Sequence, residues 1–569
     1  MTTLTTTALA ELADEYWQAF LEFSPIAATS IGVRHFDDRL DDPSPEASGD
    51  QRRRLAAFGE RAKAIDPGAL EGADAVTRSA LIDQITSDVA ALETGLEEWA
   101  VDPIEGPQVE ALDLEAIQSV STPNDARAMV SRWRALGPWF DQHAANLRRG
   151  LAAGRVAVRT PVERAVEQID GILARPDAEL PLLNPLEAEH PDWSDADRDA
   201  FEEGLRSAVR DIVRPALARY GAVISEEILP AARPDDRPGI LHVDGGREAY
   251  PRLIRLHTSL DLSPDDIHRI GLDEVARIDR ELAALGGRVF GTTDTDAIRS
   301  RLRSDAALHF TTRDEVFTTA EQALARARTA IPDWFGLLPQ ADCDVVRMGE
   351  HEEKHSTLAY YRQPAVDGSR PGQYYINTHA PETRPRYEAE ALAYHESIPG
   401  HHLQIAIGQE LTDLPEFRKH LGPTAFFEGW GLYTERLSDE MGLYSGDLDR
   451  FGILSFDGWR ACRLVLDTGI HALGWTRQQA IDYMTAHTAL EPNNIANEVD
   501  RYMVWPGQAL AYKIGQLEIL RLRAEARAAA GSRFDIRAFH DAVLGQGAVG
   551  LETLRDIVRS RFAKVGGND

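Results

Sequence analysis

The sequence predicts a large, mainly α-helical protein with one small β-sheet. Apolar residues recur at helical spacing near the start of the chain, as in Leu9, Leu12, Tyr16 and Phe20, and similar patterns continue through the first third. Runs typical of strands are confined to about residues 344–378, where Val- and Tyr-rich stretches alternate with turn residues. Helical patterns then return until the end of the chain. We therefore expect a helical body with a small sheet just before a helix of about residues 386–409.

A connector rich in Pro, Asp and Gly divides the chain near residues 230–245. We predict an N-terminal helical lobe of residues 1–235. A second lobe, residues 236–569, would hold the sheet, the 386–409 helix and the C-terminal helices. The chain has 569 residues, of which 43% are hydrophobic, so it can bury a sizeable core. We expect the two lobes to form one continuous structural unit.

Charge and cysteine content narrow the classes of partner. The chain has 92 acidic and 61 basic residues, and its net charge is −31. Such a surface repels nucleic acid and anionic membranes, so we expect neither as a partner, whereas a homodimer is compatible with the sequence. Two cysteines in the whole chain argue against a disulfide framework and against cysteine-bound zinc. We find no signal peptide and no apolar run of about 18 residues, and we predict a cytoplasmic protein.

The stretch of residues 395–404, His-Glu-Ser-Ile-Pro-Gly-His-His-Leu-Gln, is the strongest candidate for a functional site. Many zinc hydrolases place two histidines and a glutamate on one helix. The imidazoles bind the metal, and the glutamate beside the first histidine handles the proton of the metal-bound water. We therefore predict His395 as a zinc ligand and Glu396 as the catalytic base.

The position of the second histidine differs from the usual pattern. The second ligand normally follows the first by four residues, one turn along the same helix face, and here that position is Pro399. Proline has no N–H, so it breaks the helical hydrogen bond. A Pro-Gly bulge that loops out about two residues would bring His401 to the missing position. We predict His401 as the second ligand, with His402 as the other candidate. The alternative is a kinked core helix with surface histidines.

Two glutamates downstream are candidates for the third ligand. Residues 426–435 read Phe-Phe-Glu-Gly-Trp-Gly-Leu-Tyr-Thr-Glu. A carboxylate among so many apolar side chains needs a partner, and a metal is one. We predict Glu428 as the third ligand and Glu435 as a carboxylate that orients a histidine. Ordinary salt bridges at the edge of the core are the alternative.

Polar residues gather around a helix break at Pro506-Gly507 and in the last strand. A phenol can stabilise an oxyanion, and Arg or Lys can hold a substrate carboxylate. We predict Tyr512 as a catalytic residue, with Lys513 or Arg501 holding a substrate carboxylate. The substrate-binding candidates are Tyr374, Tyr375, Arg501, Tyr502, Gln508 and Lys513. The strand tyrosines would serve an extended peptide, or the strands are only a structural hairpin. His351 and His355 lie in a charged run, which we interpret as a surface loop.

Three blocks of the chain resemble one bacterial family. Residues 395–404, 427–435 and 506–515 resemble domain-of-unknown-function family 885, as do residues 371–378 and a segment near the N-terminus. The resemblance spans nearly the whole chain. Such families look distantly related to gluzincin-like zinc peptidases, including the helical oligopeptidases and metallocarboxypeptidases, in which a small sheet lines a deep cleft. The resemblance implies one zinc per chain, held by His395, His401 and Glu428, with Glu396 as base.

We therefore predict a zinc-dependent hydrolase of amide or peptide bonds. It would be carboxypeptidase- or dipeptidase-like and would act on small peptides or amino-acid conjugates. One alternative is a metal-dependent hydrolase of a non-peptide small molecule. Another is a catalytically inactive relative that binds peptides in the same cleft, which Pro399 at the ligand position would favour.

Overall fold

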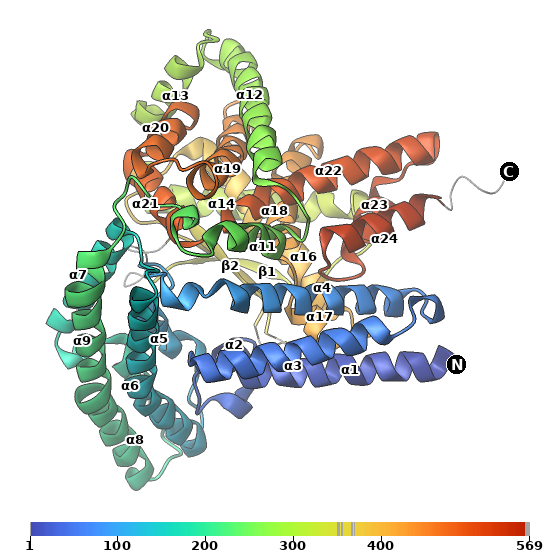
Figure 1. The fold of residues 1–569 in the computed structure, drawn as a ribbon. Helices are drawn as coiled ribbons and strands as arrows, with labels where there is room; N and C mark the ends of the chain where they lie inside the picture. Colours follow the sequence, from blue (N-terminus) through green and yellow to red (C-terminus); the bar gives the residue numbers. More distant parts are fainter. Residues whose placement is uncertain (1, 350–352, 354–356, 366–367, 369, 564–569) are drawn as a thin grey trace.

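The computed structural model shows a mainly helical chain with one small three-stranded sheet (Figure 1). It describes residues 2–349, 353, 357–365, 368 and 370–563. The predicted fold class is therefore confirmed.

The chain begins with helices that lie side by side. They are α1 (Thr2–Phe23), α2 (Pro25–Ser30), α3 (Pro45–Ala64) and α4 (Ala73–Thr94). Helix α3 begins where Pro45 fixes a helical φ at the first position and the Ser44 hydroxyl accepts a hydrogen bond from the amide of Ala47 at 3.2 Å. Helices α1, α3 and α4 form the lower layer in Figure 1.

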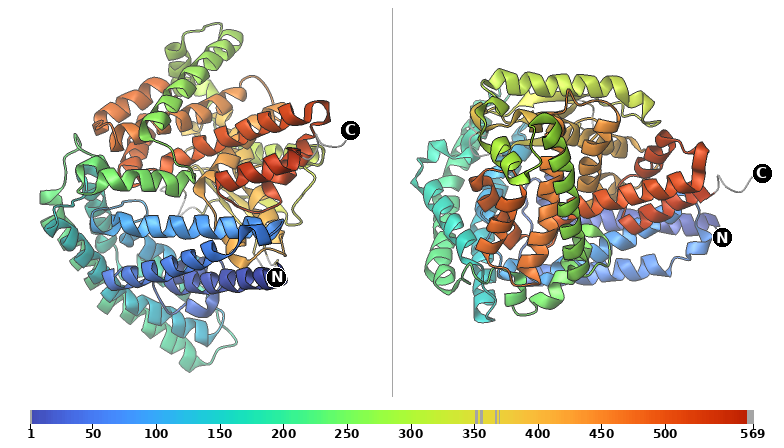
Figure 2. Two further views of the ribbon diagram at one scale, coloured as in Figure 1. Left: turned by 45° about the vertical axis from the view of Figure 1, so that its right-hand side comes forward. Right: turned by 90° about the horizontal axis from the view of Figure 1, so that it is seen from above.

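The next helices form one end of the molecule. They are α5 (Pro107–Ile117), α6 (Pro123–Ala152), α7 (Arg159–Ala174), α8 (Asp195–Ala208), α9 (Arg214–Val223) and α10 (Leu229–Ala231). A capping box at Thr122 and Asp125 fixes the start of α6. Figure 2 shows this group, in teal, from two further directions.

A third group leads into the sheet. It contains α11 (Gly246–Thr258), α12 (Pro264–Val289), α13 (Thr295–Ser304) and α14 (Arg313–Ala330), followed by β1 (Cys343–Arg347), β2 (Ala359–Arg362) and β3 (Gly372–Ile376). The strand order is β1-β3-β2. Strand β3 pairs in parallel with β1 and antiparallel with β2, so Tyr374 lies between Val345 and Tyr361.

All remaining elements are helical. They are α15 (Ala389–Glu396), α16 (His401–Glu410), α17 (Glu416–His420), α18 (Thr424–Glu440), α19 (Arg450–His471), α20 (Arg477–His487), α21 (Pro492–Val504), α22 (Ala511–Ala530), α23 (Ile536–Leu544) and α24 (Leu551–Ala563). Helix α19 runs through the interior, and nearly all its residues are buried.

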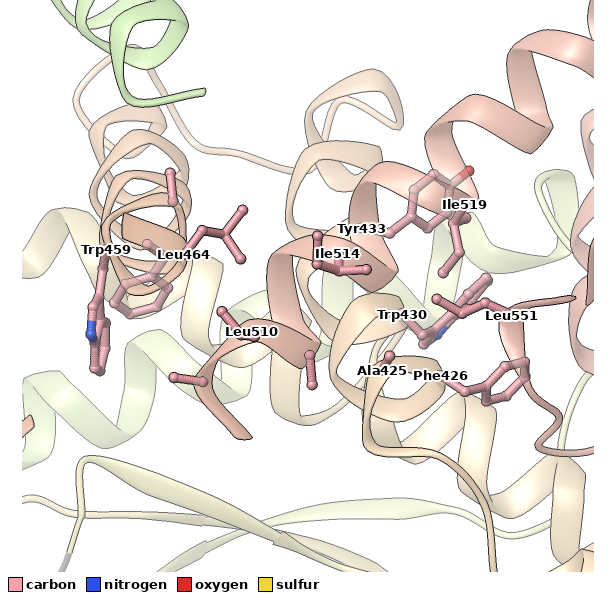
Figure 3. Close-up of a cluster of buried hydrophobic side chains, with 14 of the residues drawn as sticks. Ala425, Phe426, Trp430, Tyr433, Trp459, Leu464, Leu510, Ile514, Ile519 and Leu551 are labelled. Carbon is pink, nitrogen blue, oxygen red and sulfur yellow. The ribbon is translucent and has the colours of Figure 1, made fainter. Parts of the chain in front are cut away.

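Helices α18 and α22 are in close contact, and this packing fixes the position of α18. A Cβ atom on Gly429 of α18 would lie 2.5 Å from the Cα of Gly515 in α22, so only glycine allows this approach. Large side chains such as Trp430, Tyr433 and Ile519 fill the space beside the contact (Figure 3).

Two hydrophobic cores support the fold. The larger core combines residues from Leu9 to Trp99 with residues from Ile240 to Phe562, and Val158 also belongs to it. The smaller core consists of residues between Val101 and Ala232. The first four helices thus share a core with the second half of the chain. The division at residue 235 stays a prediction.

Candidate metal centre

The helix that was expected over residues 386–409 is broken at the histidine motif. Helix α15 ends at Glu396, and α16 begins at His401. The break is wider than the predicted two-residue bulge, because Ser397 already leaves the helical conformation with φ −105° and ψ −114°. The peptide bond before Pro399 is cis. The amide of His402 donates across the break to the carbonyl of Ser397 at 3.1 Å, and helical hydrogen bonding resumes where the amide of Gln404 donates to the carbonyl of Gly400 at 3.2 Å.

Close backbone packing at the break brings two histidines together. A Cβ atom on Gly400 would lie 1.9 Å from the carbonyl oxygen of His395, so a larger residue could not occupy this position. The indole of Trp430 donates a hydrogen bond of 3.0 Å to the carbonyl of Pro399 and anchors the break on α18. The rings of His395 and His401 end 4.7 Å apart, centroid to centroid, and nearly perpendicular.

The carboxylate of Glu428, from α18, completes a three-residue cluster. Its Oε2 lies 3.5 Å from Nε2 of His395 and 3.6 Å from Nε2 of His401. One possible ligand atom from each residue lies within 4.8 Å of the others. The three predicted ligands are thus brought together, and the cluster could hold a metal ion.

The charge environment of the cluster favours a cation. Burial acts to raise the pKa of Glu428, but hydrogen bonds from His395 and His401 outweigh it and lower the pKa well below its usual value. Burial also acts to lower the pKa of His395, yet the carboxylates of Glu428 and Glu435 raise it to about 9. The local field therefore stabilises positive charge between these side chains.

Glu435 lies behind His395, on the side away from Glu428. Its Oε1 is 2.8 Å from Nδ1 of His395, and the carboxylate is fully buried. With Nδ1 donating to Glu435, Nε2 of His395 is left as the metal-binding nitrogen. A Cβ atom on Gly431 would lie 2.7 Å from the His395 ring, so this glycine makes room for the ring.

The donor set fits zinc. Zinc sites in hydrolases use two imidazole nitrogens and one carboxylate oxygen, with a further carboxylate fixing an imidazole from behind, and one coordination position left open. His395, His401 and Glu428 supply the donors, and Glu435 supplies the supporting carboxylate.

A cavity of about 360 Å³ opens directly beside the cluster. Besides the three cluster residues, its lining includes two residues predicted as catalytic, Glu396 and Tyr512. The other lining residues are Ala359, Tyr360, Tyr361, Ile405, Phe427 and Arg460. Strand β2 therefore contributes one wall and α19 another.

His402 points away from the cluster, toward the sheet. The hydroxyl of Tyr361 lies 2.9 Å from its Nδ1, and its Nε2 lies 3.1 Å from the carbonyl oxygen of Ala341. Burial lowers the pKa of His402 to about 4, so the ring is neutral, with Nε2 donating and Nδ1 accepting. The structure therefore places His401, rather than His402, among the candidate ligands.

Four of the predicted substrate-binding residues do not line the cavity. Arg501 is paired with Glu498 at 2.9 Å and donates to Gln508 at 2.9 Å. The hydroxyl of Tyr502 donates to the same Glu498 at 2.5 Å. Lys513 is fully buried in ion pairs with Asp457 and Glu274. The side chains of these residues are engaged with the protein itself, so the structure does not bring them to the candidate centre.

The strand tyrosines Tyr374 and Tyr375 lie on β3, next to the strand that lines the cavity, and do not line it themselves. Tyr374 is fully buried, and no hydrogen-bond partner for its hydroxyl is found among the described residues. Tyr375 stacks on Tyr360 with ring centroids 4.8 Å apart. It is the neighbouring strand β2 that reaches the cavity, through Tyr360 and Tyr361. His351 and His355 lie outside the described residues.

A family model covers most of the chain. The family described as "Bacterial protein of unknown function (DUF885)" matches residues 25–558. The chain belongs to this family. A comparison with curated proteins finds no match.

Two solved structures resemble this DUF885 chain over nearly its whole length. One is described as "the putative lipoprotein from Colwellia psychrerythraea" and has a TM-score of 0.90 at 27% identity, covering 98% of this chain and 99% of its own. The other is described as "a putative lipoprotein of unknown function from Shewanella oneidensis". It has a TM-score of 0.75 at 18% identity, and the match covers 96% of this chain and 99% of the other. At that identity the second likeness shows the fold alone.

The first of these descriptions contradicts the predicted cytoplasmic location. That prediction was based on the sequence alone, whereas the Colwellia psychrerythraea structure, at 27% identity, is described as a lipoprotein. Among the helices of the described residues, none combines the length and apolar character of a membrane span.

Sequence reasoning missed Arg460 in this DUF885 chain. It lies in the cavity wall on α19, one turn before Arg463, in the otherwise apolar stretch Gly-Trp-Arg-Ala-Cys-Arg-Leu-Val-Leu. Charged residues are rarely buried unless they are paired or functional, so their presence in such a stretch was a usable signal.

Proposed function

We propose that this DUF885 protein is a zinc-dependent hydrolase of amide bonds in small peptides or amino-acid conjugates. The observation that carries this proposal is the cluster of His395, His401 and Glu428 at the wall of a cavity that also contains Glu396. Bound there, zinc would polarise the substrate carbonyl and make a nearby water more acidic.

Glu396 is placed to act as the base. It directly follows the candidate ligand His395 at the end of α15, and its side chain lines the cavity. Its carboxylate would take a proton from the attacking water as the new C–O bond forms. The same carboxyl group would then give a proton to the leaving amine as the C–N bond breaks. The products are a carboxylate and an amine.

Tyr512 is placed to donate to the developing oxyanion. Its ring lines the cavity and packs against the guanidinium group of Arg463, 4.3 Å from the ring centroid. Burial, together with the negative charge of Glu428, raises the pKa of Tyr512, so its phenol stays protonated. A protonated phenol can stabilise the charge that forms on the carbonyl oxygen.

The size and lining of the cavity support a small substrate. Its volume of about 360 Å³ lies at the lower end of the usual range for small-molecule sites. Tyr360, Tyr361 and Phe427 supply apolar and aromatic surface. The description of the Colwellia psychrerythraea structure as a lipoprotein supports an envelope location for this activity.

The test is hydrolysis of a panel of dipeptides and N-acyl amino acids by the zinc-loaded protein, with amine release as the readout. We expect Glu396→Gln to lower turnover by about 10²- to 10⁴-fold, the usual range for a lost general base, while zinc content stays unchanged. Glu382→Gln, at an exposed position before α15, is the matched control and should match the wild type.

Two outcomes would count against the proposal. Unchanged turnover in Glu396→Gln would remove Glu396 as the base. A zinc-bound wild type that releases no amine from any member of the panel would contradict the amide-hydrolase function and favour a non-peptide substrate or a binding role.

A further inference from the structure

Arg460 is a buried cation at the cavity wall that has no ion-pair partner among the described residues. Only 6% of its surface is exposed. Neither Nε nor Nη1 has a hydrogen-bond partner among the residues that the structure describes. Within the same residues, no carboxylate approaches its guanidinium closely enough to form an ion pair. A guanidinium stays charged at any physiological pH, so the cost of burying it is offset here only by aromatic rings and by the more distant charges of Glu388 and Glu435.

The nearby buried carboxylates each contact another group, although Oε2 of Glu435 has no hydrogen-bond partner among the described residues. Glu388 accepts a hydrogen bond of 2.6 Å from the hydroxyl of Ser455. Glu435 bonds to His395. Arg463, one turn further along α19, is paired with Glu498 at 2.9 Å, although its Nη1 also lacks a partner among the described residues. Arg460 differs from it in having two such donors and no ion pair within the same part of the chain.

Aromatic rings hold the Arg460 guanidinium in place. It lies 4.3 Å from the ring centroid of Trp459 and 4.7 Å from that of Phe456. The ring of Tyr512, which also lines the cavity, is 5.8 Å away. Cation–π contacts of this kind orient the group without using its N–H donors. A preoriented guanidinium with free donors beside a cavity is suited to a planar anion.

We propose that Arg460 binds a carboxylate of the substrate. The inference rests on the proposed function for the identity of the bond that is cleaved, and it names the substrate class. The substrates would be amides with a free carboxylate close to the scissile bond, such as dipeptides and N-acyl amino acids. Glu396 and Glu428 line the same cavity, so a singly charged carboxylate is favoured over a phosphate dianion. Arg460 thus takes the role that the sequence suggested for Arg501 or Lys513.

The test compares two probes that differ only in the free carboxylate. They are N-benzoylglycine and its carboxamide, N-benzoylglycinamide. Binding is measured by calorimetry on zinc-loaded protein in the Glu396→Gln background, so that neither probe is consumed. Arg460→Met removes the guanidinium, and Arg460→Lys keeps a charge without the planar fork. Arg301→Met is the control, because Arg301 also packs on an aromatic ring, Phe290 at 4.3 Å, but on the exposed surface.

We expect protein with Arg460 intact to bind the carboxylate probe at least about tenfold more tightly than the amide, as a charge-assisted pair provides. Arg460→Met should weaken carboxylate binding by about 10- to 100-fold and leave amide binding within about threefold. The affinity of Arg460→Lys for the carboxylate probe should fall between those of the parent protein and Arg460→Met. Arg301→Met should bind both probes as the parent protein does.

Two results would overturn the inference. One is equal affinity of the parent protein for both probes. The other is discrimination that survives in Arg460→Met but disappears when zinc is removed by a chelator, which would mean that the carboxylate binds the metal. Because binding is measured without turnover, Arg460-dependent discrimination together with no hydrolysis by the wild type would contradict the proposed function and leave the carboxylate site standing.

Discussion

Two charged positions on helix α19, three residues apart, have opposite surroundings. Asp457 is fully buried and accepts hydrogen bonds from Lys513, from Arg436 at 2.8 Å and from Arg277 at 3.0 Å. Arg460 is almost as deeply buried but has no such partner among the described residues. The first position is satisfied by the protein, and the second faces a cavity. Burial alone therefore does not distinguish a structural charge from a binding group, whereas its hydrogen-bond partners do.

The electrostatics of Asp457 agree with a structural role. Burial acts to raise its pKa, but the charges of Arg436, Lys513 and Arg277 outweigh it and hold the pKa far below the usual range. A lowered carboxylate pKa contributes stability above the pKa of the unfolded chain, about 3.9, and this contribution is lost as the pH falls below it.

The largest expected effect on stability is that of Lys513→Met. Removing one partner from a buried ion pair should cost about 3–5 kcal/mol, because charge on Asp457 and Glu274 is left less compensated. Denaturant unfolding at neutral pH measures this cost. We also expect the variant to lose less stability than the wild type as the pH falls below about 4. A free energy of unfolding within about 1 kcal/mol of the wild type would show that the ion pairs of Lys513 do not support the fold.

A smaller effect is expected at the carboxylate behind the metal cluster. Glu435→Gln should weaken zinc binding by about 10- to 100-fold. The glutamine can still hydrogen-bond to Nδ1 of His395, but it lacks the negative charge of the Glu435 carboxylate. Competition with a chelator measures the affinity. Glu440→Gln, on the same helix but paired with Arg523, should bind zinc as the wild type does. If both variants keep wild-type affinity, Glu435 has no part in the metal site.

The smallest expected effect is on the stability of Arg460→Met. This change breaks no ion pair of the described residues and removes a buried charge that only aromatic rings contact, so the free energy of unfolding should stay within about 1 kcal/mol of the wild type. The same denaturant titration as for Lys513→Met gives the comparison. A loss of about 3 kcal/mol or more would place Arg460 with Lys513 among the structural charges.

The sequence predicted the candidate metal cluster because two of its three members lie close together in the chain. His395, Glu396 and His401 lie within one short motif, and a proline at the usual ligand position already required a break in the helix. The width of the break was underestimated, because the break is held by a distant contact, the hydrogen bond from Trp430 to the carbonyl of Pro399, and by the close packing of Gly400.

The substrate-facing residues were harder to predict because their partners are distant in the sequence. Lys513 looked available, but its partners Asp457 and Glu274 lie 56 and 239 residues earlier. Arg460 was missed in an apolar helix, and only the fold shows that it lines the cavity and has no ion-pair partner in the part of the chain that the structure describes. The shared core of the first four helices and the second half of the chain is likewise a product of long-range packing.

The metal content of the purified protein tests the central claim most directly. Elemental mass spectrometry should find about one zinc per chain in the wild type and almost none in His401→Ala, because His401 supplies one of three protein ligands. His402→Ala is the matched control and should keep its zinc, since His402 bonds to Tyr361 and Ala341 instead. A wild type that binds no metal even when zinc is supplied, or a His401→Ala variant that keeps its zinc, would contradict the account.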